Sequence, residues 1–359
     1  MRKVKVSGKV VGEGESCFIV AEAGINHNGD VILAKRLIDA AKKAGADAVK
    51  FQTFKAKNIL TEDAVKANYQ KESRKDQESQ YEMVRRLELN REDFKELADY
   101  AKKKDIIFLS SPFDIESVDL LWEIDVPAFK IPSGEITNLP FLRYIAKKKK
   151  PIILSTGMSK LGEVEDAIDV IRDEGVEDIV LLHCVTGYPV EPQDVNLRTL
   201  QTLRCAFGLP VGFSDHTLSL TIPAVAFALG ACVIEKHLTL DKNLPGPDHK
   251  ASLEPDEFKK MVNSVREVEK ALGDGIKRPT EKEEEIKKVV RKSIVAKEFI
   301  PEGVSLTENM LTFKRPGTGI EPRYVDFIIG RKTKQAIGCL IYTSPSPRDL
   351  STSRMPSSA

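Results

Sequence analysis

Short apolar runs alternate with longer amphipathic segments from Phe18 to about Leu272. The runs are four or five residues long and rich in Val and Ile, which is typical of strands buried on both faces in a parallel sheet. Eight such runs predict strands at Phe18–Ala21, Ala48–Gln52, Ile106–Ser110, Ala128–Ile131, Ile152–Ser155, Ile179–His183, Val211–Ser214 and Val233–His237.

The segments between these runs have the periodicity of helices that bury one face. Leu161, Val164 and Ile168, for example, follow the i, i+3, i+7 spacing of an apolar stripe. Helices are predicted at Val31–Ala44, Arg91–Lys104, Glu116–Ile124, Leu139–Lys147, Leu161–Glu174, Leu197–Phe207, Leu220–Leu229 and Pro255–Leu272. Eight strand–helix pairs in about 255 residues predict an α/β fold, a (β/α)8 TIM barrel, with an open doubly wound sheet as the alternative.

The pattern changes after Leu272. Glycines and a charged stretch at Glu281–Lys288 indicate a linker that leads into a solvated helix, and short β-like units follow to about Ile337. A small β-rich domain of about 50 residues is expected there. The last residues are rich in Ser and Pro, and we interpret them as a disordered tail that could be foreign to the protein. The predicted organisation is a barrel domain at 1–275, a linker at 276–290, the small domain at 291–338 and the tail at 339–359.

The composition and the net charge of the chain argue against several classes of protein. The 359 residues carry 55 basic and 54 acidic side chains, so their net charge of +1 gives no reason to expect a nucleic-acid or membrane partner. No apolar stretch approaches the ~18 residues of a membrane span, and Met1–Glu15 lacks the apolar core of a secretion signal. Five widely spaced cysteines predict reduced core thiols, and we expect a cytoplasmic protein.

Polar side chains gather at the carboxyl ends of the predicted strands, where barrel enzymes place their chemistry. Two of them are lysines, Lys50 and Lys130, which supply the charge that hydroxyl donors alone cannot give to an anion. The hydroxyl donors are Ser111, Ser133, Ser155 and Ser214. Together these residues predict a site for a phosphate or a carboxylate.

Two histidines, His216 and His237, end the last two predicted strands. Adjacent strand ends bring their imidazoles within reach of one ion, with carboxylate from Glu22 or Glu235 nearby. Two imidazoles with oxygen ligands suit Mn²⁺ or Mg²⁺, whereas Zn²⁺ and iron are disfavoured, although they are not excluded.

Two further segments could contribute to the site. Asp248, in the rigid loop 241–253, could reach a polyhydroxy substrate. Thr61–Arg86 is either a lid over the mouth or a solvated helical excursion.

Motifs at these positions resemble the N-acetylneuraminate (sialic acid) synthase family over roughly Phe18–Ile337. The segments that carry the resemblance are AEAGINHNGD from Ala21, VKFQTF from Val49, SSPFD from Ser110, FKIPSGE from Phe129, LSTGM from Leu154, GFSDHT from Gly212, EKHLTLD from Glu235, PGPDHKASLEP from Pro245 and KRPGTGI from Lys314. The resemblance implies an enzyme that condenses phosphoenolpyruvate with an acylamino sugar. It also implies that the small domain is an antifreeze-like (SAF) domain that caps the barrel mouth of its partner in a domain-swapped homodimer.

The resemblance implies roles for individual residues. Glu22 is the candidate catalytic carboxylate that positions or deprotonates water, and His216 and His237 are the candidate catalytic metal ligands, with Mn²⁺ expected and Mg²⁺ or Co²⁺ as alternatives. The residues expected to bind phosphoenolpyruvate are Lys50, Ser111, Lys130, Ser133, Ser155, Thr186 and Ser214. Those expected to bind the sugar are Gln52, Tyr188, Asp248 and Arg315, the last reaching across the dimer.

The acceptor sugar is the least determined part of this interpretation. We predict a transferase of carbohydrate biosynthesis that converts N-acetylmannosamine, as its open-chain aldehyde, into N-acetylneuraminate. The alternative is a legionaminic acid synthase that uses 2,4-diacetamido-2,4,6-trideoxymannose. Two further interpretations are a Schiff-base aldolase with Lys50 or Lys130 as nucleophile, and a non-catalytic carbohydrate-binding or ice-binding protein.

Overall fold

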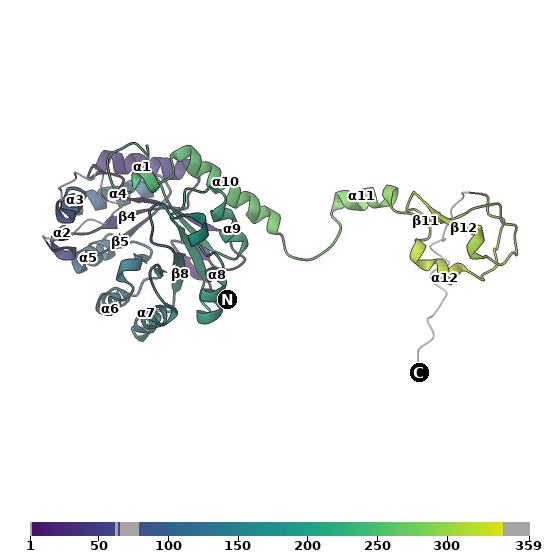
Figure 1. The fold of residues 1–359 in the computed structure, drawn as a ribbon, viewed down its shortest axis with the longest axis horizontal. Coiled ribbons are helices and arrows are strands. Elements are labelled where there is room, and N and C mark those ends of the chain that lie inside the picture. Colours follow the sequence, from purple (N-terminus) through teal and green to yellow (C-terminus); the bar gives the residue numbers. More distant parts are fainter. Residues whose placement is uncertain (1, 62–63, 65–78, 340–359) are drawn as a thin grey trace. The chain divides into compact units, whose positions relative to one another are not determined.

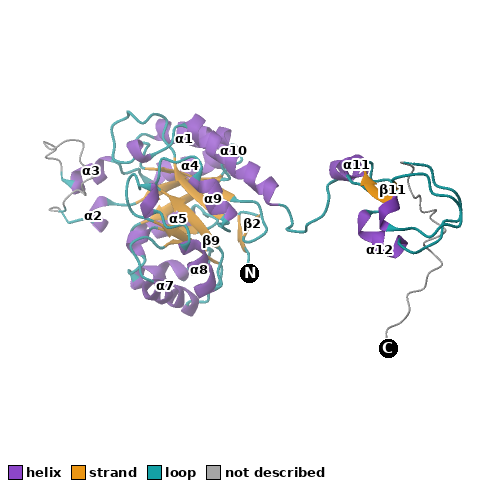
Figure 2. Cartoon of the chain, turned by 45° about the vertical axis from the view of Figure 1, so that its right-hand side comes forward, coloured by secondary structure: helices purple, strands orange, loops and turns teal. Residues whose placement is uncertain are grey.

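The computed structural model describes residues 2–61, 64 and 79–339. The chain divides into two compact units, Met1–Gly273 and Asp274–Ala359, which Figures 1 and 2 show as separately folded parts. Most of Thr61–Arg86, expected as a lid or a solvated helical excursion, and nearly all of the expected tail lie outside the described residues.

Eight parallel strands form the barrel of the first unit, and helices surround them in Figure 2. The order in the sheet is β5-β4-β3-β10-β9-β8-β7-β6, and β5 and β6 at its two ends contact each other, which closes the barrel. The strands are β3 (Phe18–Gly24), β4 (Ala48–Thr53), β5 (Ile107–Pro112), β6 (Phe129–Ile131), β7 (Ile152–Ser155), β8 (Ile179–Cys184), β9 (Val211–Asp215) and β10 (Val233–His237). The predicted eight-stranded barrel is confirmed.

Helices follow the strands along the chain, and their apolar faces pack on the outside of the barrel. Polar caps fix where several begin: the Asp30 carboxylate accepts from the N–H groups of Ile32 and Leu33, and Asn90 forms a capping box with Asp93. The helices of the unit are α1 (Val31–Ala44), α2 (Ala56–Ile59), α3 (Gln80–Arg86), α4 (Arg91–Lys103), α5 (Ile115–Glu123), α6 (Leu139–Ala146), α7 (Leu161–Asp173), α8 (Thr199–Phe207), α9 (Ile222–Ala228) and α10 (Pro255–Leu272).

A hairpin before the barrel, β1 (Val4–Val6) and β2 (Lys9–Val11), was not predicted from the sequence. Val4, Val6 and Val11 are almost completely buried, and they join the apolar cluster inside the barrel together with Phe18 and Ala48. The hairpin therefore closes the amino-terminal end of the barrel and leaves the carboxyl end of the strands for the site.

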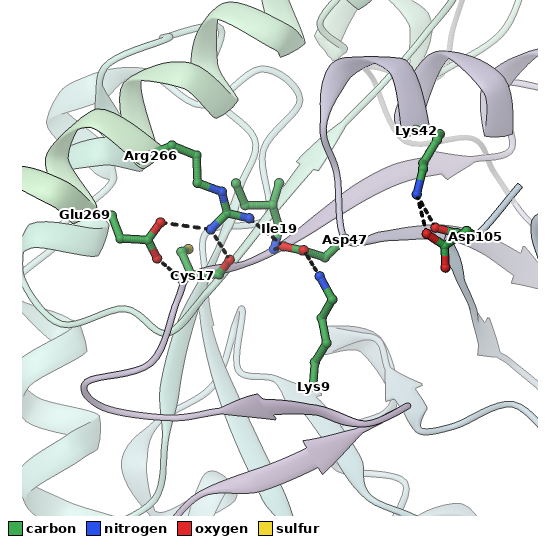
Figure 3. Close-up of polar contacts among 8 residues, drawn as sticks. All are labelled: Lys9, Cys17, Ile19, Lys42, Asp47, Asp105, Arg266 and Glu269. Carbon is green, nitrogen blue, oxygen red and sulfur yellow. Dashed lines mark hydrogen bonds and ion pairs between the residues drawn. The ribbon is translucent and has the colours of Figure 1, made fainter.

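A polar network at the amino-terminal ends of the strands joins distant parts of the chain (Figure 3). The Asp47 carboxylate accepts from the backbone N–H of Ile19 at 2.8 Å, pairs with Arg266 of α10 at 2.8 Å and also binds Lys9 of the hairpin. Arg266 donates to the carbonyl of Cys17 at 2.8 Å and pairs with Glu269. These contacts tie the first strand, the last helix and the hairpin together.

The inward-facing residues of the strands form two layers. The lower layer is apolar and includes Val20, Leu109 and Ile153. Because side chains alternate along a strand, the residues two positions further, Glu22, Ser111 and Ser155, face the same interior one layer higher. The apolar layer is the floor on which the polar residues of the site stand.

The second unit begins with an exposed helix, α11 (Glu281–Val290), in the charged stretch. A two-stranded antiparallel sheet follows, β11 (Ser293–Ala296) and β12 (Leu311–Lys314), with a short helix α12 (Val325–Ile328) after it. Its core consists of Ile294, Ala296, Ile300, Leu306 and Leu311. It is a small unit with an antiparallel sheet, in agreement with the β-rich domain expected after the barrel.

The cysteines agree with their prediction only in part. All five are free, and Cys17, Cys184 and Cys232 are buried, but Cys205 and Cys339 are exposed, since neither faces the apolar core of its unit. Among the helices of residues 2–61 and 79–339, none is long and apolar enough to span a membrane.

Candidate active site

A cavity of about 280 Å³ lies among residues that follow or end the barrel strands. Thirteen of the fourteen predicted site residues line it: Glu22, Lys50, Gln52, Ser111, Lys130, Ser133, Ser155, Thr186, Tyr188, Ser214, His216, His237 and Asp248. The exception, Arg315, follows β12 in the second unit. All eight strands contribute a lining side chain because each strand's inward face turns polar near its carboxyl end.

Two lysines and two glutamates form a buried charged cluster in this cavity. The Lys50 Nζ lies 2.6 Å from a carboxylate oxygen of Glu22 and 3.7 Å from one of Glu235. The Lys130 Nζ lies 3.2 Å from the other oxygen of Glu235, to which Ser214 also donates at 2.8 Å. Lys50 therefore contacts both carboxylates, whereas Lys130 pairs with Glu235.

The protonation equilibria of the two glutamates move in opposite directions. Burial raises the pKa of Glu22 above its ordinary value, and the neighbouring Lys50 ammonium only partly offsets this. Burial acts on Glu235 as well, but Lys130 and Lys50 outweigh it and lower the pKa of Glu235 to about 2. Glu235 is therefore a fixed negative charge, whereas Glu22 is a carboxylate that takes up a proton more readily than an ordinary glutamate.

The pKa values of the two lysines are also shifted in opposite directions. Burial alone would lower the pKa of Lys50, but Glu22 and Glu235 outweigh it and raise that pKa above its ordinary value. For Lys130, burial prevails over Glu235 and lowers the pKa. Lys50 also donates to Ser111 at 3.2 Å, which directs a charge and a hydroxyl to the same part of the cavity.

Hydroxyl groups surround the lysines. Ser155 Oγ is buried and has no hydrogen-bond partner, so it is available for a ligand. Ser133 Oγ accepts from the backbone N–H of Gly157 at 3.0 Å. A Cβ on Gly157 would lie 2.6 Å from Thr186 Oγ1 and 2.7 Å from Ser133 Oγ, so only glycine lets these two hydroxyls approach each other here.

The two histidines face each other next to Tyr188. Their ring centroids are 5.4 Å apart, and the Tyr188 ring stacks on His216 at 4.3 Å. His216 Nδ1 lies 2.8 Å from the carbonyl oxygen of Val185, which fixes the ring orientation. Burial lowers the pKa of His237 well below its ordinary value, and its Nδ1 is buried without a hydrogen-bond partner. A neutral imidazole with a free nitrogen is the form that binds a metal.

Two further predicted residues, Gln52 and Asp248, complete the lining. Gln52 donates to Glu22 at 3.4 Å. Asp248 is buried at the end of the loop after β10, and burial raises its pKa to about 6. Its backbone carbonyl accepts from Ser252 at 2.6 Å, and Ser252 also binds Asn26 of the loop after β3. The loop that carries Asp248 is thus fixed to the first strand's loop.

Two titratable lining residues, Glu235 and Cys184, were not assigned to the site from the sequence. Glu235 was considered only as a carboxylate near the histidines, although its spacing of two residues from His237 already places both on one face of the strand. Cys184 was read as a core thiol, but it lines the cavity and lies 4.0 Å from His216 Nδ1. Its neighbour in the strand, His183, ends the predicted strand but binds the Val195 carbonyl at 2.7 Å.

A barrel with buried lysines and hydroxyls at its strand ends is typical of an enzyme with an anion site there. A profile described as the NeuB family matches residues 37–277. The chain is 55% identical over 314 residues to the N,N'-diacetyllegionaminic acid synthase of Campylobacter jejuni, covering 87% of this chain and 94% of that protein. It is 39% identical over 328 residues to the N-acetylneuraminate-9-phosphate synthase of Homo sapiens, covering 90% of each.

A solved structure agrees with these sequences. The N-acetylneuraminic acid (sialic acid) synthetase of Leptospira borgpetersenii, crystallised with citrate, superposes with a TM-score of 0.70 at 35% identity, covering 79% of this chain and 95% of that one. The chain therefore belongs to the NeuB family. It is an enzyme of the phosphoenolpyruvate-condensing synthases that make nonulosonic acids, as the sequence motifs indicated.

Proposed function

We propose that this enzyme is a legionaminic acid synthase, which condenses phosphoenolpyruvate with 2,4-diacetamido-2,4,6-trideoxymannose and water and releases phosphate. The observation that carries the choice of acceptor is the difference in identity, 55% to the Campylobacter legionaminic acid synthase against 39% to the human N-acetylneuraminate-9-phosphate synthase. These relatives favour the alternative named in the sequence analysis over the predicted acceptor, N-acetylmannosamine.

Phosphoenolpyruvate would bind at the charged cluster. Its phosphate and carboxylate need cations and directional donors, and Lys50 and Lys130 lie among the hydroxyls of Ser111, Ser133, Ser155, Thr186 and Ser214. The raised pKa of Lys50 keeps it an ammonium, which suits an anion ligand and makes Lys50 a poor nucleophile for a Schiff base.

The reaction forms one carbon–carbon bond and breaks one carbon–oxygen bond. The methylene carbon of phosphoenolpyruvate attacks the open-chain aldehyde, whose oxygen takes a proton and becomes a hydroxyl. Water then adds to the cationic carbon that bears the phosphate, and loses a proton. The tetrahedral intermediate expels inorganic phosphate, and the carbonyl of the 2-oxo acid forms.

Glu22 is suited to the water step. Its raised pKa makes it a stronger base than an ordinary glutamate, and its negative charge stabilises the cationic carbon before the water adds. Glu235, held ionised, balances the charge of Lys130. Gln52, Tyr188 and Asp248 would contact the acceptor, and Arg315 would do so from the partner subunit.

A divalent metal fits between His216 and His237, since the free buried Nδ1 of His237 gives one ligand and the anchored ring of His216 a second. Among residues 2–61 and 79–339 no group of three or more His, Cys, Asp or Glu side chains could hold an ion, so the remaining ligands would be water and substrate oxygens. When bound, the metal supplies Lewis acidity to the aldehyde oxygen. Mn²⁺ is the proposed ion.

The second unit is proposed as an antifreeze-like capping domain. Its antiparallel sheet and the KRPGTGI segment support this assignment, and the family resemblance supports a domain-swapped homodimer. Sedimentation of the full chain would test the dimer, which a monomer at all concentrations would contradict.

The test of function is phosphate release from phosphoenolpyruvate with Mn²⁺ and each acceptor in turn, with product masses measured. We expect the diacetamido trideoxy sugar to be used with the higher kcat/KM, and chelation to abolish release. Turnover of N-acetylmannosamine alone would overturn the proposed acceptor. Trapping with borohydride and pyruvate should leave the enzyme unmodified, and a reduced adduct on Lys50 or Lys130 would point to an aldolase.

A further inference from the structure

One side of the cavity is apolar. It is formed by Ile59, Leu60, Met83, Val84 and Leu87, which we call the apolar wall. Most polar lining residues stand on the strands or in the loops that follow them. The apolar wall comes from α2, α3 and the residues that end these two helices, which belong to the excursion after β4 and lie side by side (Figure 1). Gln80, at the start of α3, also lines the cavity. The cavity therefore has a polar floor and an apolar flank.

The apolar wall is a packed surface and not a set of isolated side chains. Met83 and Leu87 are buried, with 2% and 1% of their surface exposed, and they form a cluster with Phe54. Ile59 and Val84 pack on that cluster and stay half-buried. The half-buried residues leave apolar surface that a ligand in the cavity can cover.

In the proposed function, the residues of the polar floor bind phosphoenolpyruvate and the aldehyde end of the acceptor. The apolar wall is the part of the cavity lining left for the far end of the acceptor. The trideoxy sugar carries a methyl group at C6 and an acetamido methyl at C4, where N-acetylmannosamine carries hydroxyls. A hydroxyl pressed against apolar side chains loses its hydrogen bonds to water without replacement, whereas a methyl gains burial.

We infer that the apolar wall recognises the methyl groups at the far end of the acceptor and so determines the acceptor preference of this enzyme. The inference rests on the proposed function and adds to it the residues that discriminate. An apolar pocket rejects a hydroxyl only moderately, so the preference for the trideoxy sugar over N-acetylmannosamine should be about 10- to 100-fold in kcat/KM.

Val84→Thr tests this inference, because threonine has nearly the shape of valine but brings a hydroxyl to the apolar wall. We expect the ratio of kcat/KM for the two acceptors to fall about 10-fold toward N-acetylmannosamine. Val84→Ile, which keeps the surface apolar, should keep the preference. Val225→Thr on α9, an exposed position outside the cavity, is the matched control and should behave as the unaltered enzyme.

The outcomes separate the inference from the function on which it rests. An unaltered enzyme that prefers N-acetylmannosamine overturns the proposed acceptor. An unaltered enzyme that prefers the trideoxy sugar, combined with a Val84→Thr variant whose ratio is unchanged, overturns the apolar wall alone. If kcat/KM falls for both acceptors, thermal melting of the variant will show whether the loss comes from unfolding.

Discussion

Glu22 of β3 and Lys50 of β4 face each other on neighbouring strands, with 2.6 Å between carboxylate oxygen and ammonium nitrogen and both side chains almost wholly out of water. The pair holds a positive charge for an anion beside the carboxylate proposed as the base. Replacing Glu22 by Gln keeps the shape but removes the base and leaves Lys50 with one fewer carboxylate.

We expect Glu22→Gln to lower kcat by at least ~100-fold, the usual scale of a general base. The KM for phosphoenolpyruvate should change much less, because the cations remain. Steady-state kinetics with both substrates varied will measure this. A kcat within a few-fold of the unaltered enzyme would remove Glu22 from the water step.

Gly157→Ala should weaken phosphoenolpyruvate binding. The added Cβ would lie within 2.7 Å of the hydroxyl oxygens of Thr186 and Ser133, which must then move. Strain of this kind costs about 1–3 kcal/mol, so kcat/KM for phosphoenolpyruvate should fall roughly 5- to 150-fold. Gly162→Ala, where the added Cβ meets nothing within 4 Å, is the control and should retain full activity.

Arg266→Ala should destabilise the barrel without touching the chemistry. The substitution removes the arginine that donates to the Cys17 carbonyl and to Asp47 Oδ2, which keeps only the Ile19 N–H (Figure 3), at a cost of about 2 kcal/mol. Lys42→Ala breaks the exposed pair with Asp105 in the same figure and should cost less than ~1 kcal/mol. Urea unfolding of both variants will compare them, and equal losses would contradict the argument.

The buried His27 should make the free energy of unfolding fall at acidic pH. Burial lowers its pKa from 6.5 to about 4, so the unfolded chain binds the proton before the folded one. The contribution of neutral His27 to the free energy of unfolding is therefore complete above pH ~6.5. It is lost as the pH falls toward 4, by up to about 3 kcal/mol. His27→Asn should lose less stability than the unaltered protein between pH 7 and pH 4.5, as urea unfolding at each pH will show. Parallel losses would contradict the shift.

The sequence predicts the barrel and most of the polar residues that line the cavity, because one rule governs both. Polar residues such as Lys130 and Ser155 end buried strands, and parallel strands of a barrel bring those ends together. The hairpin β1–β2 was not predicted because its strands have only three residues each, although Ser7 and Gly8 indicate a turn.

Side-chain partners across strands could not be predicted in the same way. The pairing of Glu235 with Lys130 joins β10 to β6, and the sequence gives no distance between them. The apolar wall also needed the structure, since Met83 and Val84 lie in a segment whose spacing was equally consistent with a solvated helix. Only its packing on Phe54 places it beside the cavity.

The pairing of β3 with β10 has a consequence for synthesis. Glu22 pairs in register with His237, so the first strand of the barrel waits for the last to leave the ribosome. At ~5–20 residues per second this delay is roughly 10 to 40 s. During that time one edge of β3, all apolar but for Glu22 and glycine, has no neighbour. Until residue 237 arrives, this edge presents unpaired backbone N–H and C=O groups to any other strand.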